Sequence, residues 1–213
     1  MFKRSYLIAA MLCLFVQLGI CGNKPMYGPA KIVLGDNYET VASKYDQIYN
    51  FNEGYAVVQK NDLSGLIDIK GEERIATKYY SLGFYSDGLI AVKEHKGDKT
   101  GFINLKEKMV ISPQFEFTMN FHKGVCIASV NSDSAIAINK KGKFLWAFPQ
   151  GVKPYGDFSN GWAMVRQGDL YSYISTEGEL IKYQYKGASP FFFKTGYYEL
   201  PFAIALVYSD SHD

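Results

Sequence analysis

Short apolar segments alternate with polar turns along most of the chain. Each segment is four to seven residues long, is rich in valine, isoleucine and aromatic residues, and is bounded by glycine, asparagine or aspartate. Runs of this length with these boundaries predict β-strands, because they are too short for helices. After the N-terminal segment no stretch keeps a helical period, so the pattern predicts an all-β fold.

The predicted strands belong to tandem repeats, each starting at an aromatic residue three positions before a glycine. Successive glycines are separated by 34, 36, 37 and 35 residues. The pairs are Phe51 and Gly54, Tyr85 and Gly88, Phe121 and Gly124, Phe158 and Gly161, and a fifth start at Phe193 and Gly196. One unit is too small to bury both faces of its sheet, so we expect the units to stack. The sequence predicts an array of about four and a half antiparallel β repeats of about 35 residues.

A second landmark keeps step with the first, and it consists of an apolar pair, a polar residue and a tight turn. Its recurring glycines are Gly65, Gly71, Gly101, Gly142 and Gly178. Glycine beside aspartate or asparagine supplies the backbone conformations that tight turns require. Each unit is therefore interpreted as an aromatic anchor, a turn and three strands, with the anchors in the core between repeats.

These motifs resemble the bacterial WG-repeat family, whose units read as an aromatic residue, two polar residues and glycine, then a strand, then Trp-Gly-aromatic-Ile-Asp. The similarity covers roughly residues 44–196. The family tryptophan is replaced by Ser64 and Thr100, and the following glycine by Ile136 and Ser172. The resemblance implies an all-β scaffold that is common in exported bacterial proteins and is usually taken to mediate interactions. It carries over no catalytic residue, cofactor or metal ligand.

The repeat number leaves two architectures open. Four full units could close into a small propeller, since propellers begin at four blades. Units of this length are lean for blades, however, and the fifth start at Phe193 indicates that the array continues. An open or partly wound, propeller-like array is the prediction.

The first 21 residues predict a secretory signal. Lys3 and Arg4 precede an apolar stretch over residues 6–18, which is shorter than a membrane span of about 20 residues. A buried N-terminal helix is the alternative. Either signal peptidase cleaves after Cys21, or Cys21 is lipidated within a segment that resembles a lipobox, although Ile20 departs from that pattern. The mature protein is then exported to the periplasm, the cell surface or the medium.

The domain boundaries follow from these patterns. Residues 1–21 form the signal, 22–43 a lead-in, 44–196 the repeat array and 197–213 a divergent tail. The tail is strongly apolar before its polar end, so we expect it to cap the last exposed sheet edge, with a partner-binding segment as the alternative.

Charge and cysteine content argue against nucleic-acid binding and against an intramolecular disulfide. Loss of Lys3 and Arg4 with the signal leaves 21 basic against 21 acidic residues, which gives no positive face for nucleic acid. Cys126 is the one thiol certain to remain in the mature chain, so an intramolecular disulfide is excluded. It lies in an apolar run, which predicts a buried, unreactive side chain.

The sequence supports no catalytic, cofactor or metal site. His95, His122 and His212 have no ligands at metal-binding spacing, and nucleophile and phosphate-loop motifs are absent. A hydrolase that uses a carboxylate pair is a third, less favoured hypothesis. Its candidates are Glu53, Asp87, Asp68 and Asp46. Because acidic residues recur from unit to unit, a role in turns is the favoured interpretation.

Two binding functions remain. One is an interaction module for a protein or a cell-envelope component, on a surface like those of other repeat arrays. The other is a carbohydrate-binding module. Its candidate aromatic residues are Tyr155, Trp162, Tyr171 and Tyr173. A row of exposed aromatic side chains would favour sugar, and a mixed polar and apolar surface would favour protein.

Overall fold

The computed structural model describes residues 27–131, 134–181, 187–188 and 205–206. The predicted signal, Cys21 and the fifth repeat start at Phe193 lie outside these residues. In the described part, no helix is long and apolar enough to cross a membrane.

The described chain forms three four-stranded sheets, one three-stranded sheet and one two-stranded sheet, all antiparallel. The first sheet contains β1 (Gln47–Ile48), β2 (Tyr55–Lys60), β3 (Leu63–Asp68) and β4 (Glu73–Tyr79). The second contains β5 (Ser81–Leu82), β6 (Ile90–Lys93), β7 (Thr100–Ile103) and β8 (Met109–Phe115). The third contains β9 (Phe117–Thr118), β10 (Val125–Asn131), β11 (Ser134–Asn139) and β12 (Phe144–Ala147). The fourth contains β13 (Lys153–Pro154), β14 (Trp162–Gln167) and β15 (Leu170–Ser175).

The all-β repeat prediction is confirmed, and each of the first four sheets corresponds to one repeat with its strands in chain order. This is the strand arrangement of a propeller blade. The prediction of three strands per unit missed one element, because each of these sheets also has a two-residue strand that precedes the aromatic anchor. In the fourth unit the predicted last strand, Leu180–Ile181, is reduced to an isolated bridge between Ile174 and Leu180. We call β1, β5, β9 and β13 the leading strands.

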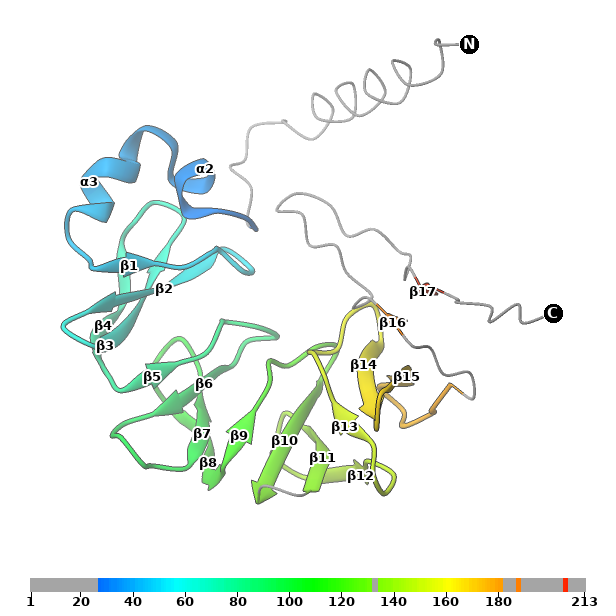
Figure 1. Cartoon of the computed structure of the whole chain (residues 1–213). Helices are drawn as coiled ribbons and strands as arrows, with labels where there is room; N and C mark the ends of the chain where they lie inside the picture. The colour runs from blue at the N-terminus through cyan, green and yellow to red at the C-terminus, as the bar shows by residue number, and fades with distance from the viewer. Residues whose placement is uncertain (1–26, 132–133, 182–186, 189–204, 207–213) are drawn as a thin grey trace, which may run out of the picture.

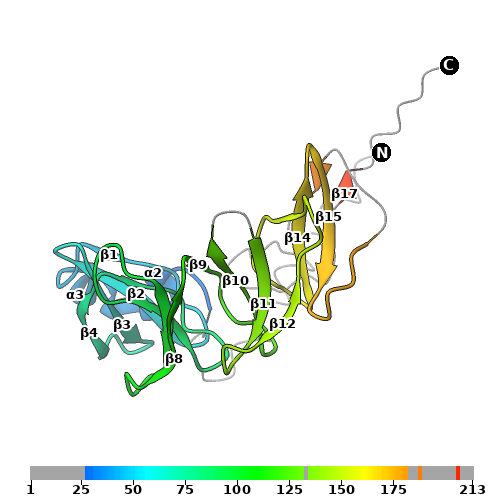
Figure 2. The same ribbon diagram turned by 90° about the horizontal axis from the view of Figure 1, so that it is seen from below.

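The sheets follow one another along an open arc (Figures 1 and 2). The first sheet does not close a ring, because its outer face packs against a helical segment. That segment consists of α2 (Ala30–Leu34), the 3-10 turn η1 (Gly35–Asn37) and α3 (Tyr38–Ala42). Val33, Leu34 and Val41 form a buried cluster with Ala56 and Val58 of β2. The sequence shows no sustained helical period in the lead-in, because these helices have only five residues each, too few for a periodic pattern.

Every interface between neighbouring sheets has its own apolar core, because successive residues of a strand point to opposite faces. In β6, Ile90 and Val92 pack toward the first sheet, while Ala91 and the preceding Leu89 pack toward the third. In β10, Cys126 faces the second sheet and Ile127 the fourth. The second and third strands of the sheets are therefore buried on both faces, whereas the outer strands β4, β8 and β12 are largely exposed.

Three of the four predicted anchors lie in these cores between sheets, whereas Phe51 lies in the core between the first sheet and the helical segment. Phe51, Phe121 and Phe158 are buried, and Tyr85 is half-buried, with its ring centroid 4.7 Å from that of Tyr55. The turns after the anchors have two consecutive residues of positive φ, which identifies them as type I′ hairpins. The second residues of these turns are Gly54, Gly88, Gly124 and Gly161. Glycine adopts this conformation without the steric cost of a Cβ atom.

The second turn of each unit is stabilised by one polar side chain. Asp68 accepts hydrogen bonds from the N–H groups of Lys70 and Glu72, at 2.9 and 3.0 Å. The corresponding acceptors in the other units bind the N–H groups two and four residues ahead in the same way, and they are Asn104, Asn139 and Ser175.

The same turn also contacts the preceding unit. A Cβ atom on Gly142 would lie 2.7 Å from Ile111, and one on Gly178 would lie 3.0 Å from Trp146. Gly71 makes the equivalent approach to Val41 of α3, so the helical segment takes the place of a preceding sheet. In the second unit the position is Glu107 with φ 58°.

The predicted tail is described only at β17 (Ala205–Leu206), which pairs antiparallel with β16 (Gly187–Ala188). The rest of residues 197–213 lies outside the described part, so a capping role remains a prediction.

Candidate binding site

The leading strands present a mixed polar and apolar set of side chains at one register position. The first residue of each leading strand pairs with the residue at the equivalent repeat position in the second strand of its sheet. These first residues are all exposed, and they are Gln47, Ser81, Phe117 and Lys153. Each leading strand ends the strand order of its sheet, so among the described residues one of its edges has no strand partner. We call this set the leading row.

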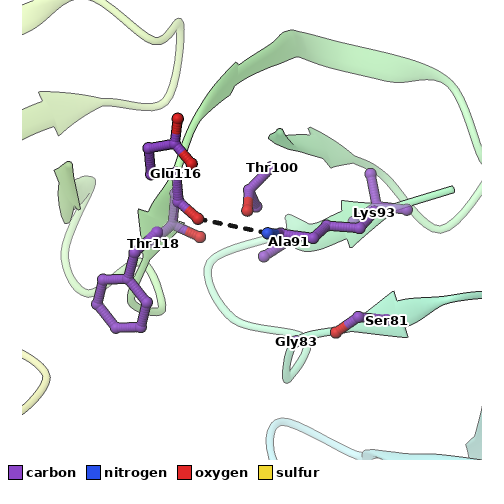
Figure 3. A pocket seen from close by; sticks show the side chains of 9 residues that line it. Ser81, Gly83, Ala91, Lys93, Thr100, Glu116 and Thr118 are labelled. Atoms are coloured by element: carbon purple, nitrogen blue, oxygen red, sulfur yellow. Dashed lines mark hydrogen bonds between the residues drawn. The ribbon is translucent and has the colours of Figure 1, made fainter. Parts of the chain in front are cut away.

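A cavity of about 210 Å³ lies between the second sheet and the first strand of the third (Figure 3). Its walls come from β5, β6 and β7 on one side and from the β8–β9 connection and β9 on the other. The lining residues are Ser81, Gly83, Ala91, Val92, Lys93, Thr100, Glu116, Phe117 and Thr118. The apolar contact between Phe102 and Phe121, with ring centroids 4.9 Å apart, belongs to the core of the same interface.

Gly83 lines this cavity at a position that carries a larger side chain in other units. In each unit the residue that follows the leading strand donates its N–H to a carbonyl of the second strand, as Gly83 does to Ala91 at 2.9 Å. Tyr49 and Met119 take this position in the first and third units, and their side chains pack into the cores that follow those sheets. Gly83 supplies no side chain to the corresponding core, and it packs closely against Ala91, since a Cβ atom on Gly83 would lie 3.1 Å from Cβ of Ala91.

Polar groups of several strands converge on the cavity. Lys93 is half-buried, and its Nζ donates to the backbone oxygen of Glu116 at 3.4 Å (Figure 3). Within the described residues, no hydrogen bond is formed by the hydroxyl groups of Ser81, Thr100 or Thr118. The Glu116 carboxylate lies 3.4 Å from Nζ of Lys99, which lies outside the lining.

The acidic residues of the first turns bind the backbone of the next unit. Glu53 accepts from the N–H of Asp87 at 3.1 Å, and Asp87 accepts from the N–H of Gly124 at 2.6 Å. Beside them, Ser86 donates its hydroxyl to the carbonyl of Phe121 at 2.6 Å. Two of the four carboxylates considered for a hydrolase therefore connect one repeat to the next.

The other two carboxylates also serve turns. Asp46 accepts from the N–H of Asn61 at 2.7 Å. Asp68 is paired with Arg74 at 2.6 Å. Burial alone would raise the pKa of Asp68, but the hydrogen bonds from Arg74 and from two backbone N–H groups outweigh it and lower that pKa.

A polar contact also joins the first and second units at their outer strands. Glu107 accepts from Nζ of Lys78 at 2.6 Å and from the hydroxyl of Tyr79 at 2.8 Å. These bonds lower the pKa of Glu107. Burial, together with the bond to Glu107, raises the pKa of Tyr79 to about 12.

Cys126 is fully buried, as predicted. Its Sγ donates to the carbonyl of Met119 at 3.1 Å, and burial raises the pKa of the thiol. A thiol with a raised pKa is a poor nucleophile. Across the described residues, no group of three His, Cys, Asp or Glu side chains is arranged to hold a metal ion.

The aromatic residues considered for sugar binding do not form an exposed row. Tyr173 is 2% exposed, whereas Trp162 and Tyr171 are half-buried. Tyr155 alone among the four is exposed, at 54%, and its ring centroid lies 5.3 Å from that of Tyr171.

The comparison that decides the family is a match to the model of the WG-containing repeat. It matches residues 39–63, 65–99, 101–132 and 155–171, half of the chain. The chain belongs to the WG-repeat family. In this WG-repeat protein Thr100 takes the position of the family tryptophan in the second unit, so a small side chain lines the cavity.

No curated protein matches the sequence. Among solved structures, virginiamycin B lyase from Staphylococcus aureus is similar with a TM-score of 0.43 and 17% identity, over 65% of this chain and 54% of that one. BamB from Moraxella catarrhalis is similar with a TM-score of 0.42 and 12% identity, over 66% of this chain and 50% of that one. The WG-repeat chain thus covers about half the length of these structures.

Sequence reasoning missed both parts of this candidate site. The leading strands have two residues each, too few to show alternation. Gly83 falls outside the repeated glycine positions. Only an alignment of the units shows that it stands where Tyr49 and Met119 stand, and such an alignment could have identified Gly83 from the sequence.

Proposed function

We propose that this WG-repeat protein is an exported, non-catalytic interaction module that binds a protein or another component of the cell envelope. The leading row is the observation that carries the proposal. Its exposed residues combine amide, hydroxyl, aromatic and ammonium groups, and its strands have open edges. Mixed chemistry beside open strand edges suits a protein partner, whose main chain can pair with a strand.

A carbohydrate-binding function has less support. Sugar recognition on a flat surface would need several exposed rings, and the burial of Tyr173 removes one of the candidate rings from solvent. A carboxylate-pair hydrolase also has less support, because Glu53 and Asp87 are engaged by backbone N–H groups of the following units.

Export gives the first prediction. Protein isolated from the envelope of its native host should lack residues 1–20 and carry a diacylglyceryl group on Cys21, or start unmodified near Gly22. Intact-mass spectrometry measures this directly. The first result places the module on a membrane surface and the second makes it soluble, whereas a chain that retains Met1 would contradict export.

Partner binding gives the second prediction. The photoreactive residue p-benzoylphenylalanine should form a discrete cross-linked species when it replaces Phe117 of the leading row in the native host. Phe144 of β12 is the matched control, since it is 61% exposed against 52% for Phe117 and lies on the last strand of the same sheet. Gel electrophoresis and mass spectrometry after irradiation measure the products.

The two positions make the outcome decisive. A species formed from position 117 and not from position 144 supports a partner at the leading row. Equal cross-linking from both positions, or none from position 117, contradicts the proposed surface.

A further inference from the structure

We propose that the cavity beside Gly83 binds the C-terminal residue of a polypeptide, with its free carboxylate held by Lys93. This inference deepens the proposed function and rests on it, because it names the part of a protein partner that the module would recognise. The leading strand β5 forms one wall of the cavity, so the cavity and the leading row are continuous.

Lys93 offers an anion a positively charged partner inside the cavity. Lys93 supplies an ammonium group inside the cavity, and its contact with the backbone oxygen of Glu116 is long, at 3.4 Å. The Glu116 carboxylate also lines the cavity, but it is 56% exposed and is paired with Lys99. The lining therefore contains one positive and one negative group, but within the described residues Lys93 forms no ion pair. A carboxylate would gain a charge-assisted hydrogen bond from it.

The hydroxyl groups complete the anion site. Ser81, Thr100 and Thr118 come from β5, β7 and β9, and each can donate one hydrogen bond. Thr100 is 5% exposed, so little of the residue reaches solvent. An ammonium and three donors match the acceptor capacity of one carboxylate, which has two oxygens with about four lone-pair sites.

The rest of the cavity suits a small apolar group. Gly83 and Ala91 line it and present no bulky side chain. About 210 Å³ is less than the range of about 300–1,000 Å³ that holds drug-sized ligands. A volume of this size suits one terminal residue.

A peptide end fits better than an acidic sugar. β5 and β9 border the cavity, and each ends the strand order of its sheet, so the residues before a C-terminus can pair with an open edge. The lining contains a single aromatic residue, Phe117, whereas sugar rings are commonly held on aromatic faces. The main chain and the carboxylate of a peptide thus both find partners.

Fluorescence anisotropy tests the proposal by measuring how tightly labelled peptides bind to the full-length mature protein. The probes are fluorescein-labelled hexapeptides that end in Ala, Val, Leu or Phe, each made with a free and with an amidated C-terminal carboxyl group. We expect at least one free acid to bind at least about tenfold more tightly than its amide, since a hydrogen bond to a charged group contributes this much or more.

Two substitutions address the two parts of the cavity. Lys93→Gln should abolish the difference between acid and amide, and Lys108→Gln should keep it, because Lys108 is exposed just before β8 and does not line the cavity. Gly83→Met places in the second unit the side chain that Met119 has in the third, and it should weaken the acid at least about tenfold. Because its Cβ would lie 3.1 Å from that of Ala91, a small shift of Ala91 is needed, and the thermal midpoint measures whether the chain still folds.

Three results would overturn the inference. The first is equal binding of the free acid and the amide, and the second is a difference between them that survives Lys93→Gln. The third is displacement of the peptide by glucuronic acid at lower concentration than by N-acetylvaline, which would assign the cavity to an acidic sugar.

The failure of this inference can be distinguished from the failure of the proposed function. If the peptides do not bind but cross-linking at position 117 persists, the proposed function stands without the cavity. If the peptides bind and cross-linking fails, the cavity stands and the leading row does not.

Discussion

Replacement of Phe121 by alanine is expected to lower the free energy of unfolding by about 3–5 kcal/mol, the usual cost of removing a buried phenylalanine ring. Phe121 is 2% exposed and contacts Phe102 in the core between the second and third sheets. Its carbonyl also accepts the hydroxyl hydrogen of Ser86. Urea unfolding followed by the fluorescence of Trp146 and Trp162 measures the change.

Phe117→Ala is the control for this experiment. Phe117 is 52% exposed and lies four residues earlier in the same chain segment. Its replacement should change the free energy of unfolding by no more than about 0.5 kcal/mol. Similar losses for the two variants would show that the anchor does not hold the neighbouring sheets together.

Replacement of Gly101 by alanine is expected to cost about 1–3 kcal/mol, because the new methyl group overlaps atoms that cannot move independently. A Cβ atom there would lie 2.7 Å from the oxygen of Ile111 and 2.9 Å from the nitrogen of Pro113. Both atoms belong to the backbone of β8. The same urea titration measures the loss.

Gly156→Ala is the matched control. No atom lies within 4 Å of a Cβ built on Gly156, and its φ is outside the left-handed region, so the change should stay within about 0.5 kcal/mol. Gly101→Ala with an equally small effect would show that β7 and β8 separate at no cost.

The structure explains why the position of Gly101 is glycine in some units and a larger residue in others. The register shifts on both sides of Leu66 in the first unit and of Phe102 in the second, next to Gly65 and Gly101. In the third unit Ile136 replaces the glycine, and the pairing of β11 with β12 has a single shift. Glycine is therefore needed where the third and fourth strands of a sheet approach closely at a bulge.

The repeat period, the long strands and the turns were predictable because they depend on local chemistry. A glycine in a type I′ turn and a side-chain acceptor ahead of a tight turn act through residues that are neighbours in sequence. The burial of Phe51, Phe121 and Phe158 followed from their phase in the repeat. The predicted roles of Cys21, Phe193 and the tail concern residues outside the described part of the chain, apart from Ala205 and Leu206.

The candidate site could not be predicted in the same way. Lys93, Thr100 and Thr118 lie on three strands and meet only when the second and third sheets stack. Thr100 stands at the position of the family tryptophan, but Lys93 and Thr118 belong to no motif. The leading row likewise depends on strand pairing, because Phe117 lacks the glycine that follows an anchor such as Phe121 by three residues and is placed in the sheet only by the pairing of β9 with β10.

The sequence by itself determined that this protein is a stack of similar antiparallel β units, because period and turn chemistry are written in every repeat. The tertiary structure alone decided what each unit meets. It placed α2 and α3 against the first sheet, and it brought strands of the second and third sheets together around the cavity. Contacts between units depend on side-chain size across an interface, and a cavity there exists only when residues that are distant in the sequence meet.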